Sequence, residues 1–305
     1  MQNWQKYLNG DPLPWLLELE NPSIRYWTLL DILDRSENDP EVQETRSAIA
    51  QQALVKQLFA LQHPQGYWGD ETKPHSAQGA VAALTLLHRL GVIPCERTAA
   101  GCDSFLKNCQ HESGGFSMTK KIRSGIFPCT TGEHLSFLVY FGLGDDPRVR
   151  AAFAFLINVM SAEDALDCGR YAHHDCLWGA IAALNGLAAL PVDMHSVQSD
   201  GVVKRLAAAL LDAPYDFEGE HKRWFTFGVP RGWDMLSALK ALAAHGYAHD
   251  DRFVVLLKLV VDRQNEQGQW LCGSVSRTWP VEKRNQPSKW VTLDVLRVLK
   301  STVLT

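Results

Sequence analysis

Three cysteines and one histidine in the middle of the chain carry the side chains of a zinc site. They are Cys129, Cys168, His174 and Cys176. Three thiolates and one imidazole suit the tetrahedral coordination of zinc, although the Cys-x5-His-x-Cys spacing is looser than that of a zinc finger. His173 could replace His174, and Asp167 could enter as an oxygen ligand. The alternative is a group of buried free cysteines, which are common in protein cores.

The number of protein ligands would decide what such a zinc ion does. A closed site of three cysteines and one histidine has no open position and is typical of structural zinc. Three protein ligands and a bound water are typical of catalytic zinc. The spacing of the residues leaves both forms open.

Two further side chains, Asp234 and His134, are candidate catalytic residues, and each lies near the beginning of a predicted helix. Asp234 could act as a lone acid in a cavity, or it could stabilise the N-terminus of its own helix. The chain has no Gly-x-Ser-x-Gly, Gly-x-Gly-x-x-Gly or P-loop motif. Esterases built on a nucleophile elbow and proteins with nucleotide cofactors are therefore not expected.

Composition narrows the class of protein. A net charge of −4 argues against a nucleic-acid partner. We expect no signal peptide, because the opening residues are polar, and no transmembrane segment, because the apolar stretch Phe253–Val261 is short and contains Lys258. Seven cysteines are an odd number and indicate reduced thiols, so we expect a cytoplasmic protein.

A repeated motif indicates the elements that position these residues. The spacing Gln-x3-Gly-x-aromatic occurs at Gln62, Gln110 and Gln264. Apolar periodicity predicts a helix before and after each copy. Further segments of the same kind predict six helical hairpins of roughly 50 residues each. The helices predicted to follow the turns, with an earlier related one, cover 23–33, 76–90, 130–143, 176–190, 232–245 and 288–299.

The helices of the other set share an acidic start. Asp39-Pro, Asp146-Pro and Asp251-Arg each precede an apolar-periodic segment, and aspartate is a favoured helix cap. The first and last repeats, which contain Asn21-Pro-Ser and Gln286-Pro-Ser, resemble each other. The ends of an open solenoid usually carry atypical polar repeats, so this likeness favours a closed ring. We therefore predict one domain spanning residues 1–305.

The repeated turns with alternating helices resemble the terpenoid cyclase and protein prenyltransferase superfamily from about Asn21 to Lys300. Pro128-Cys-Thr-Thr-Gly132, the Cys168–Cys176 segment and Pro287-Ser-Lys-Trp-Val-Thr-Leu look like bacterial squalene-cyclase-like or prenyltransferase-like proteins without an established activity. The resemblance implies an all-α α/α toroid, an inner barrel of parallel helices wrapped by outer helices. It also prefers His174 over His173 as the histidine ligand.

In such a toroid the N-termini of the inner helices would collect at one rim, which should favour anions. The residues expected to line the cavity mouth are Arg25, Tyr26, His75, Trp178, Arg231, Trp233, Lys289 and Trp290. The basic residues among them could instead be ordinary solvated charges. A cavity with apolar walls and a basic mouth suits a hydrophobic or amphiphilic small molecule such as an isoprenoid diphosphate.

The resemblance therefore favours an enzyme of transferase or cyclase type that acts on an isoprenoid-like substrate, with Zn²⁺ as a cofactor. Two departures stand against a direct transfer of function. The chain does not reproduce the Asp, Cys and His zinc ligands of the prenyltransferases, and it lacks the Asp-x-Asp-Asp acid of class II terpene cyclisation. The alternative is a non-catalytic toroid that binds a ligand or a protein partner, with structural zinc or without metal.

Overall fold

The computed structural model describes residues 3–118, 125–167, 176–215, 224–229 and 234–302. The chain groups into two compact units, which we describe separately. The first unit comprises Met1–Lys56, Arg89–Val92 and Pro214–Thr305. The second comprises Gln57–His88 and Ile93–Ala213. Cys168, His174, Arg231 and Trp233 lie outside the described residues.

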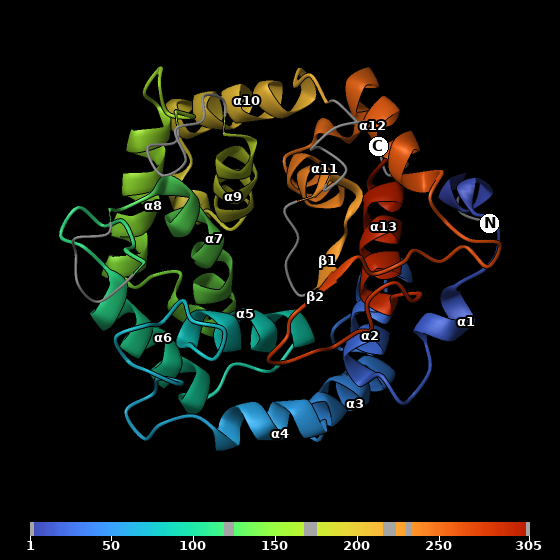
Figure 1. The fold of residues 1–305 in the computed structure, drawn as a ribbon, viewed down its shortest axis with the longest axis horizontal. Helices are drawn as coiled ribbons and strands as arrows, with labels where there is room; N and C mark the ends of the chain where they lie inside the picture. Colours follow the sequence, from blue (N-terminus) through green and yellow to red (C-terminus); the bar gives the residue numbers. More distant parts are fainter. Residues whose placement is uncertain (1–2, 119–124, 168–175, 216–223, 230–233, 303–305) are drawn as a thin grey trace. The chain divides into compact units, whose positions relative to one another are not determined.

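The first unit is built almost entirely from helices in its described part (Figure 1). Two short strands, β1 (Gly228–Val229) and β2 (Ser274–Val275), pair in parallel. Short 3₁₀ helices cover Asn3–Tyr7 and Tyr247–His249, and a π-helical segment, Thr28–Ile32, continues α2. The α-helices are α1 (Leu13–Leu16), α2 (Pro22–Trp27), α3 (Pro40–Ile49), α11 (Met235–Ala244), α12 (Asp251–Val261) and α13 (Lys289–Ser301).

The second unit is helical throughout its described elements. Its helices α7 and α9 pack closely, because the backbones meet at two glycines. A Cβ atom on Gly132 would lie 2.5 Å from the Ala182 carbonyl oxygen, and one on Gly186 would lie 2.7 Å from the Gly132 carbonyl oxygen. The helices are α6 (Glu96–Cys109), α7 (Pro128–Leu138), α8 (Pro147–Met160), α9 (Leu177–Leu187) and α10 (Val197–Leu211), with a π-helical segment at Val139–Leu143 and a 3₁₀ helix at Val192–Met194. Two of the boundaries between the units fall within helices, one in α4 (Ala53–Ala60) and one in α5 (Ala80–Leu90).

The repeated glutamine closes its own turn and fastens it to the following helix. The Gln110 amide donates to the carbonyl oxygens of Gly114 (2.9 Å) and Arg148 (2.6 Å), the latter at the beginning of α8. Gln62 does the same with Gly66 (2.9 Å) and with Arg97 at the beginning of α6 (2.8 Å). One amide group thus explains why glutamine recurs in the motif.

The motif glycine is required by the backbone conformation of the turn, and the motif tryptophan makes a specific hydrogen bond. Gly114 has a φ of +93°, and a Cβ atom there would lie 2.4 Å from the Ala151 carbonyl oxygen. Only glycine combines this φ with so close a backbone approach. The Trp68 indole donates to the carbonyl oxygen of Leu58 and the Trp270 indole to that of Val260, both at 2.7 Å. Both rings are buried.

The third copy of the motif joins the N-terminal segment to the turn that follows α12, within the first unit. The Gln264 amide donates to the Tyr7 carbonyl oxygen (2.8 Å), and the Asn9 backbone N–H donates to the Gln264 side-chain oxygen (2.8 Å). A Cβ atom on Gly268 would lie 2.5 Å from the Gly10 carbonyl oxygen. The N-terminal segment thus takes the position that α6 and α8 take after the other two copies.

The acidic helix starts are confirmed at two positions and corrected at a third. Asp39 and Asp146 cap α3 and α8, each followed by proline. The predicted cap Asp251 is wrong by one residue. The Asp250 carboxylate accepts from the Arg252 backbone N–H (2.9 Å), whereas Asp251 is the first residue of α12. Two adjacent aspartates compete for one cap, and the sequence alone does not rank them.

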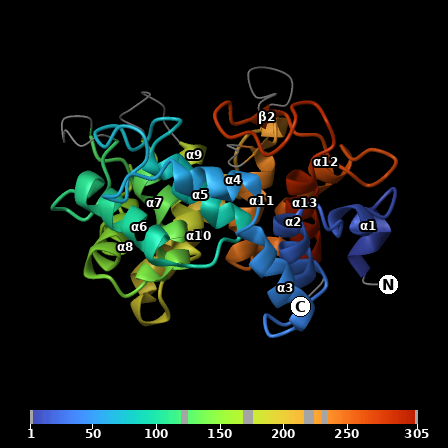
Figure 2. The ribbon, with the colours of Figure 1, turned by 90° about the horizontal axis from the view of Figure 1, so that it is seen from below.

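Helix α13 is the centre of the first unit. Nearly every residue from Lys289 to Lys300 is buried, so the helix packs on all sides. It contacts α1, α2, α11 and α12, and Figures 1 and 2 both show α11 alongside it. Among the described residues, no helix combines the length and apolar character needed to cross a bilayer.

Candidate ligand site

The structure describes two of the four predicted zinc ligands. Cys129 lies in the first turn of α7, and Cys176 is the N-cap residue of α9. Both are half-buried, and their two helices pack against each other. Cys168 and His174 lie outside the described residues. The residues that are described contain no group of three histidine, cysteine or acidic side chains arranged to hold a metal ion.

The other described cysteines are buried, except Cys95. Cys102 and Cys109 are buried on α6, and burial raises the pKa of the Cys102 thiol and, to about 12, that of the Cys109 thiol. Cys272 is buried, and Cys95 is an exposed residue preceding α6. The raised pKa values keep the Cys102 and Cys109 thiols protonated near neutral pH and make them poor metal ligands or nucleophiles.

His134 and His75 lie together in an aromatic cluster of the second unit. Their ring centroids are 5.0 Å apart. His134 is completely buried on α7, and its ring centroid lies 5.3 Å from that of Phe105 and 5.6 Å from that of Phe137. The structure therefore brings together a predicted catalytic residue and a predicted cavity residue, in surroundings dominated by aromatic packing.

Asp234 is the N-cap of α11. Its Oδ1 accepts from the Ser237 backbone N–H (2.9 Å) and hydroxyl (3.0 Å), and its Oδ2 accepts from the Gly228 backbone N–H (2.9 Å). Burial raises the pKa of Asp234, and the hydrogen bonds from Ser237 and Gly228 oppose this shift. The geometry is that of a helix cap, the second of the two roles the sequence allowed. A catalytic role for Asp234 remains a prediction.

The predicted cavity residues at the beginnings of α2 and α13 have protein partners. Arg25 pairs with Glu41 and donates to the Leu17 carbonyl oxygen. Tyr26 is buried, with the Arg46 guanidinium 5.2 Å from its ring centroid. Lys289 pairs with Glu18 at 2.5 Å. In the second unit, Trp178 is half-buried near the beginning of α9.

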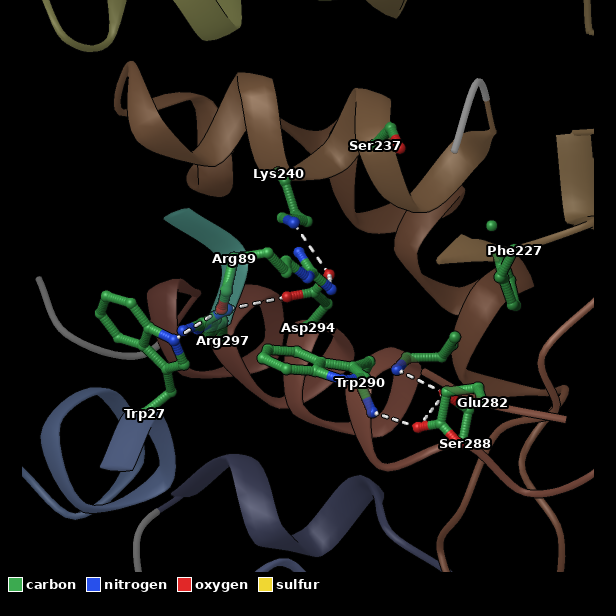
Figure 3. Close-up of polar contacts among 12 residues, drawn as sticks. Trp27, Arg89, Phe227, Ser237, Lys240, Glu282, Ser288, Trp290, Asp294 and Arg297 are labelled. Carbon is green, nitrogen blue, oxygen red and sulfur yellow. Dashed lines mark hydrogen bonds and ion pairs between the residues drawn. The ribbon is translucent and has the colours of Figure 1, made fainter. Parts of the chain in front are cut away.

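Trp290, a predicted cavity residue, lies beside a group of charged side chains that the sequence did not predict. Its ring is buried, and the Arg89 guanidinium carbon lies 4.7 Å from the ring centroid, a cation–π arrangement. The Trp290 backbone N–H donates to the Glu282 carboxylate (3.2 Å). Figure 3 shows these contacts beside a group of charged side chains between α11 and α13.

At the centre of this group is Asp294, a buried carboxylate on α13. Its Oδ2 accepts from Arg89 (2.6 Å) and from the Lys240 ammonium (2.8 Å), and its Oδ1 accepts from Arg297 (2.9 Å) (Figure 3). The partners come from the end of α5, the middle of α11 and α13 itself. We call Arg89, Lys240, Asp294 and Arg297 the charged cluster.

The charged cluster continues toward the N-terminal segment of the first unit. Arg297 also pairs with Asp31, and its guanidinium carbon lies 5.3 Å from the Trp27 ring centroid. Lys300 pairs with Asp34 at 2.5 Å and donates to the Asp31 carbonyl oxygen (2.8 Å). The Trp27 indole donates to the Arg89 carbonyl oxygen (2.9 Å). These bonds tie the end of α5 and the α2 segment to α13.

The cluster fixes the protonation of its members. Burial alone would raise the pKa of Asp294, but the charges of Arg89, Lys240 and Arg297 outweigh it and hold that pKa well below its usual range. Burial, reinforced by the neighbouring arginines and opposed by Asp294, lowers the pKa of Lys240 to about 8. Asp294 is therefore ionised near neutral pH and cannot donate a proton.

The first unit also contains a separate cavity of about 790 Å³ near α12. Ala248, Leu257, Val261 and Leu299 are its buried apolar residues, and Lys258 and Asp262, which form an ion pair (2.7 Å), also line it. Tyr7 and Gln264 also line it. Its volume is in the range of small-molecule pockets.

No protein-family model matches the chain, and a search of curated proteins finds no match. Among solved structures, the chain is similar to a variant of the type II terpene cyclase MstE from Scytonema in complex with its substrate, geranylgeranyl dihydroxybenzoate. The identity is 14%, the match covers 93% of this chain and 87% of that chain, and the TM-score is 0.51. A protein from Actinoplanes is 15% identical over 94% of this chain and 89% of that chain, with a TM-score of 0.49.

At this level of identity the first of these likenesses bears on the fold alone. It extends over nearly the whole chain, and the described elements are helices apart from one short pair of strands. It confirms the predicted all-α, α/α-toroid fold class and the resemblance that the repeated turns indicated. The chain therefore has the fold of the terpenoid cyclases.

Proposed function

We propose that this protein binds an amphiphilic isoprenoid, a polyprenyl chain that carries a polar head group. The proposal is carried by the likeness over 93% of the chain to a terpene cyclase variant solved with geranylgeranyl dihydroxybenzoate. Fold alone does not fix function. The chemistry of the first unit adds support, because it places cationic side chains beside the indole rings of Trp27 and Trp290.

Direct binding measurements test this proposal. Geranylgeranyl dihydroxybenzoate would be titrated into the purified protein by calorimetry, with palmitate as a straight-chain amphiphile for comparison. We expect one molecule to bind per chain and the isoprenoid to bind at least tenfold more tightly than palmitate. Absence of isoprenoid binding, or equal affinity for both amphiphiles, would contradict the proposal.

The same complex separates an enzyme from a binding protein. Incubation followed by chromatography and mass spectrometry would detect a cyclised isomer as a new peak of unchanged mass. Asp234, whose pKa burial raises, is the proton donor to test on this reaction. A product that forms equally well in Asp234→Asn would exclude that role, and a ligand recovered unchanged would favour the non-catalytic alternative. Ser237→Ala, which removes one hydroxyl contact to Asp234, serves as the control for altered capping.

We further propose zinc at Cys129, Cys168, His174 and Cys176. Support comes from the half-buried thiols of Cys129 and Cys176, which lie at the beginnings of two packed helices. Elemental analysis of the purified protein should find about one zinc per chain. Cys176→Ser should lose the metal, whereas the exposed Cys95→Ser should retain it. Wild-type protein that stays zinc-free after reconstitution would end this proposal.

A further inference from the structure

We propose that Arg89 and Lys240 form an anion site that receives a carboxylate or phosphate group of the ligand. The apolar part of that ligand rests on the proposed function, whereas the anion site rests on the charged cluster itself. The site would place the acidic head group between the end of α5 and the middle of α11. It would thereby select acidic isoprenoids over neutral ones.

The first argument is the crowding of positive charge. Arg89 and Lys240 both donate to the same oxygen, Oδ2 of Asp294, at 2.6 and 2.8 Å. Two cationic groups that share one oxygen lie close enough to repel each other strongly at a partly buried position. A second anion bridging the two would relieve this repulsion and would gain two charge-assisted hydrogen bonds.

The second argument is the charge balance. The carboxylates of Asp31 and Asp34 pair with Arg297 and Lys300. Of the carboxylates that the structure describes, Asp294 is the one that pairs with Arg89 and Lys240, and it also accepts from Arg297. With Lys300, Asp31 and Asp34 added to the charged cluster, four cations face three carboxylates among the described residues, which leaves one positive charge in excess. A monoanionic ligand group would neutralise it.

The third argument is that Lys240 and Arg89 have N–H donors that could bind a further anion. Asp294 takes one of the three protons of the Lys240 ammonium, and the side chain is 32% exposed. The Nε of Arg89 is buried without an acceptor among the described residues. Trp290 supports the guanidinium from one side. A guanidinium held in this way presents its edge, the geometry that binds carboxylate and phosphate groups.

A comparison of charged and neutral probes tests the site. The probes are geranylgeranyl dihydroxybenzoate, the neutral alcohol geranylgeraniol, and inorganic phosphate alone. We expect wild-type protein to bind the acid at least tenfold more tightly than the alcohol. Lys240→Met should weaken acid binding about ten- to hundred-fold, the effect of one charge-assisted hydrogen bond, and should leave alcohol binding unchanged.

Lys258→Met provides a matched control. Lys258 is also a helical lysine paired with an aspartate of the first unit, but it lines the cavity near α12. Loss of acid binding in Lys258→Met but not in Lys240→Met would assign the ligand to that cavity and overturn the inference. Lys240→Arg, which keeps the charge, should retain acid binding. If Lys240→Met does not fold, Arg89→Gln takes its place with the same expected selective loss.

The outcomes separate this inference from the proposed function. Equal effects of Lys240→Met on the acid and the alcohol would refute the anion site while the isoprenoid proposal stands. If phosphate binds in a Lys240-dependent way but neither prenyl probe binds, the anion site stands and the isoprenoid proposal fails. Binding of the acid without binding of phosphate assigns the site to a head group attached to an apolar chain.

Discussion

Replacement of Asp294 by asparagine is the most demanding test of the charged cluster. The substitution preserves the shape of the side chain but removes the only carboxylate that Arg89, Lys240 and Arg297 share in the described structure. The Asp294 side chain is 6% exposed, so its contacts with the three cations are largely shielded from water. Removing one partner of a buried ion pair typically costs about 3–5 kcal/mol. We expect a loss of stability in this range for Asp294→Asn.

The assay is equilibrium unfolding in urea, followed by far-ultraviolet circular dichroism. Asp262→Asn is the control, because it breaks an exposed pair with Lys258 at 2.7 Å and should cost about 0–1 kcal/mol. The double variant Asp294→Asn/Lys240→Met should be more stable than Asp294→Asn by about 1–2 kcal/mol, since one repelling cation is gone. A loss below about 1 kcal/mol for Asp294→Asn would refute the view that these charges depend on one buried carboxylate.

Further predictions concern pH, the repeated turns and one helix glycine. Burial lowers the pKa of Lys240 to about 8, whereas the pKa of Asp294 is held low and that of Arg297 is raised, so neither of these groups titrates in this range. Calorimetry should therefore show acid-probe affinity falling as pH rises from about 7 to about 9, with alcohol affinity constant. In urea unfolding, Gly114→Ala should cost more than about 2 kcal/mol because of its positive φ and the nearby Ala151 carbonyl. Gly201→Ala, at an open position of α10, should instead stabilise by up to about 1 kcal/mol. Gln110→Ala, which loses two hydrogen bonds, should cost about 1–3 kcal/mol. A cost equal to that of a surface substitution would contradict the role of Gln110.

The repeated motif could be recognised in the sequence because its residues make local hydrogen bonds or adopt local backbone conformations. Gln62 and Gln110 bond to their own turns, and the motif glycines adopt conformations that other residues avoid. Helix starts were readable for the same reason, since Asp39 and Asp146 bond to backbone two residues ahead. Such short-range requirements leave a fixed spacing in the sequence.

The charged cluster left a weaker signal. Arg89 and Lys240 are single charges within otherwise largely apolar helices, whereas Asp294 shares α13 with Lys289, Arg297 and Lys300. This pattern suggests a buried charge or a solvated helix edge equally well. Sequence spacing places Arg89 and Asp294 more than two hundred residues apart, so nothing local indicates that they pair.

The sequence by itself determined the repeat, the turn chemistry, the helical class and the resemblance to the terpenoid cyclases, because periodicity and capping act over a few residues. Only the tertiary structure decided which side chains meet. It assigned Asp234 to a helix cap, His134 to an aromatic cluster and Trp290 to Arg89. It also brought Lys240 and Arg89 to one oxygen of Asp294. Those contacts depend on how helices pack on α13, and packing joins residues whose separation along the chain carries no pattern.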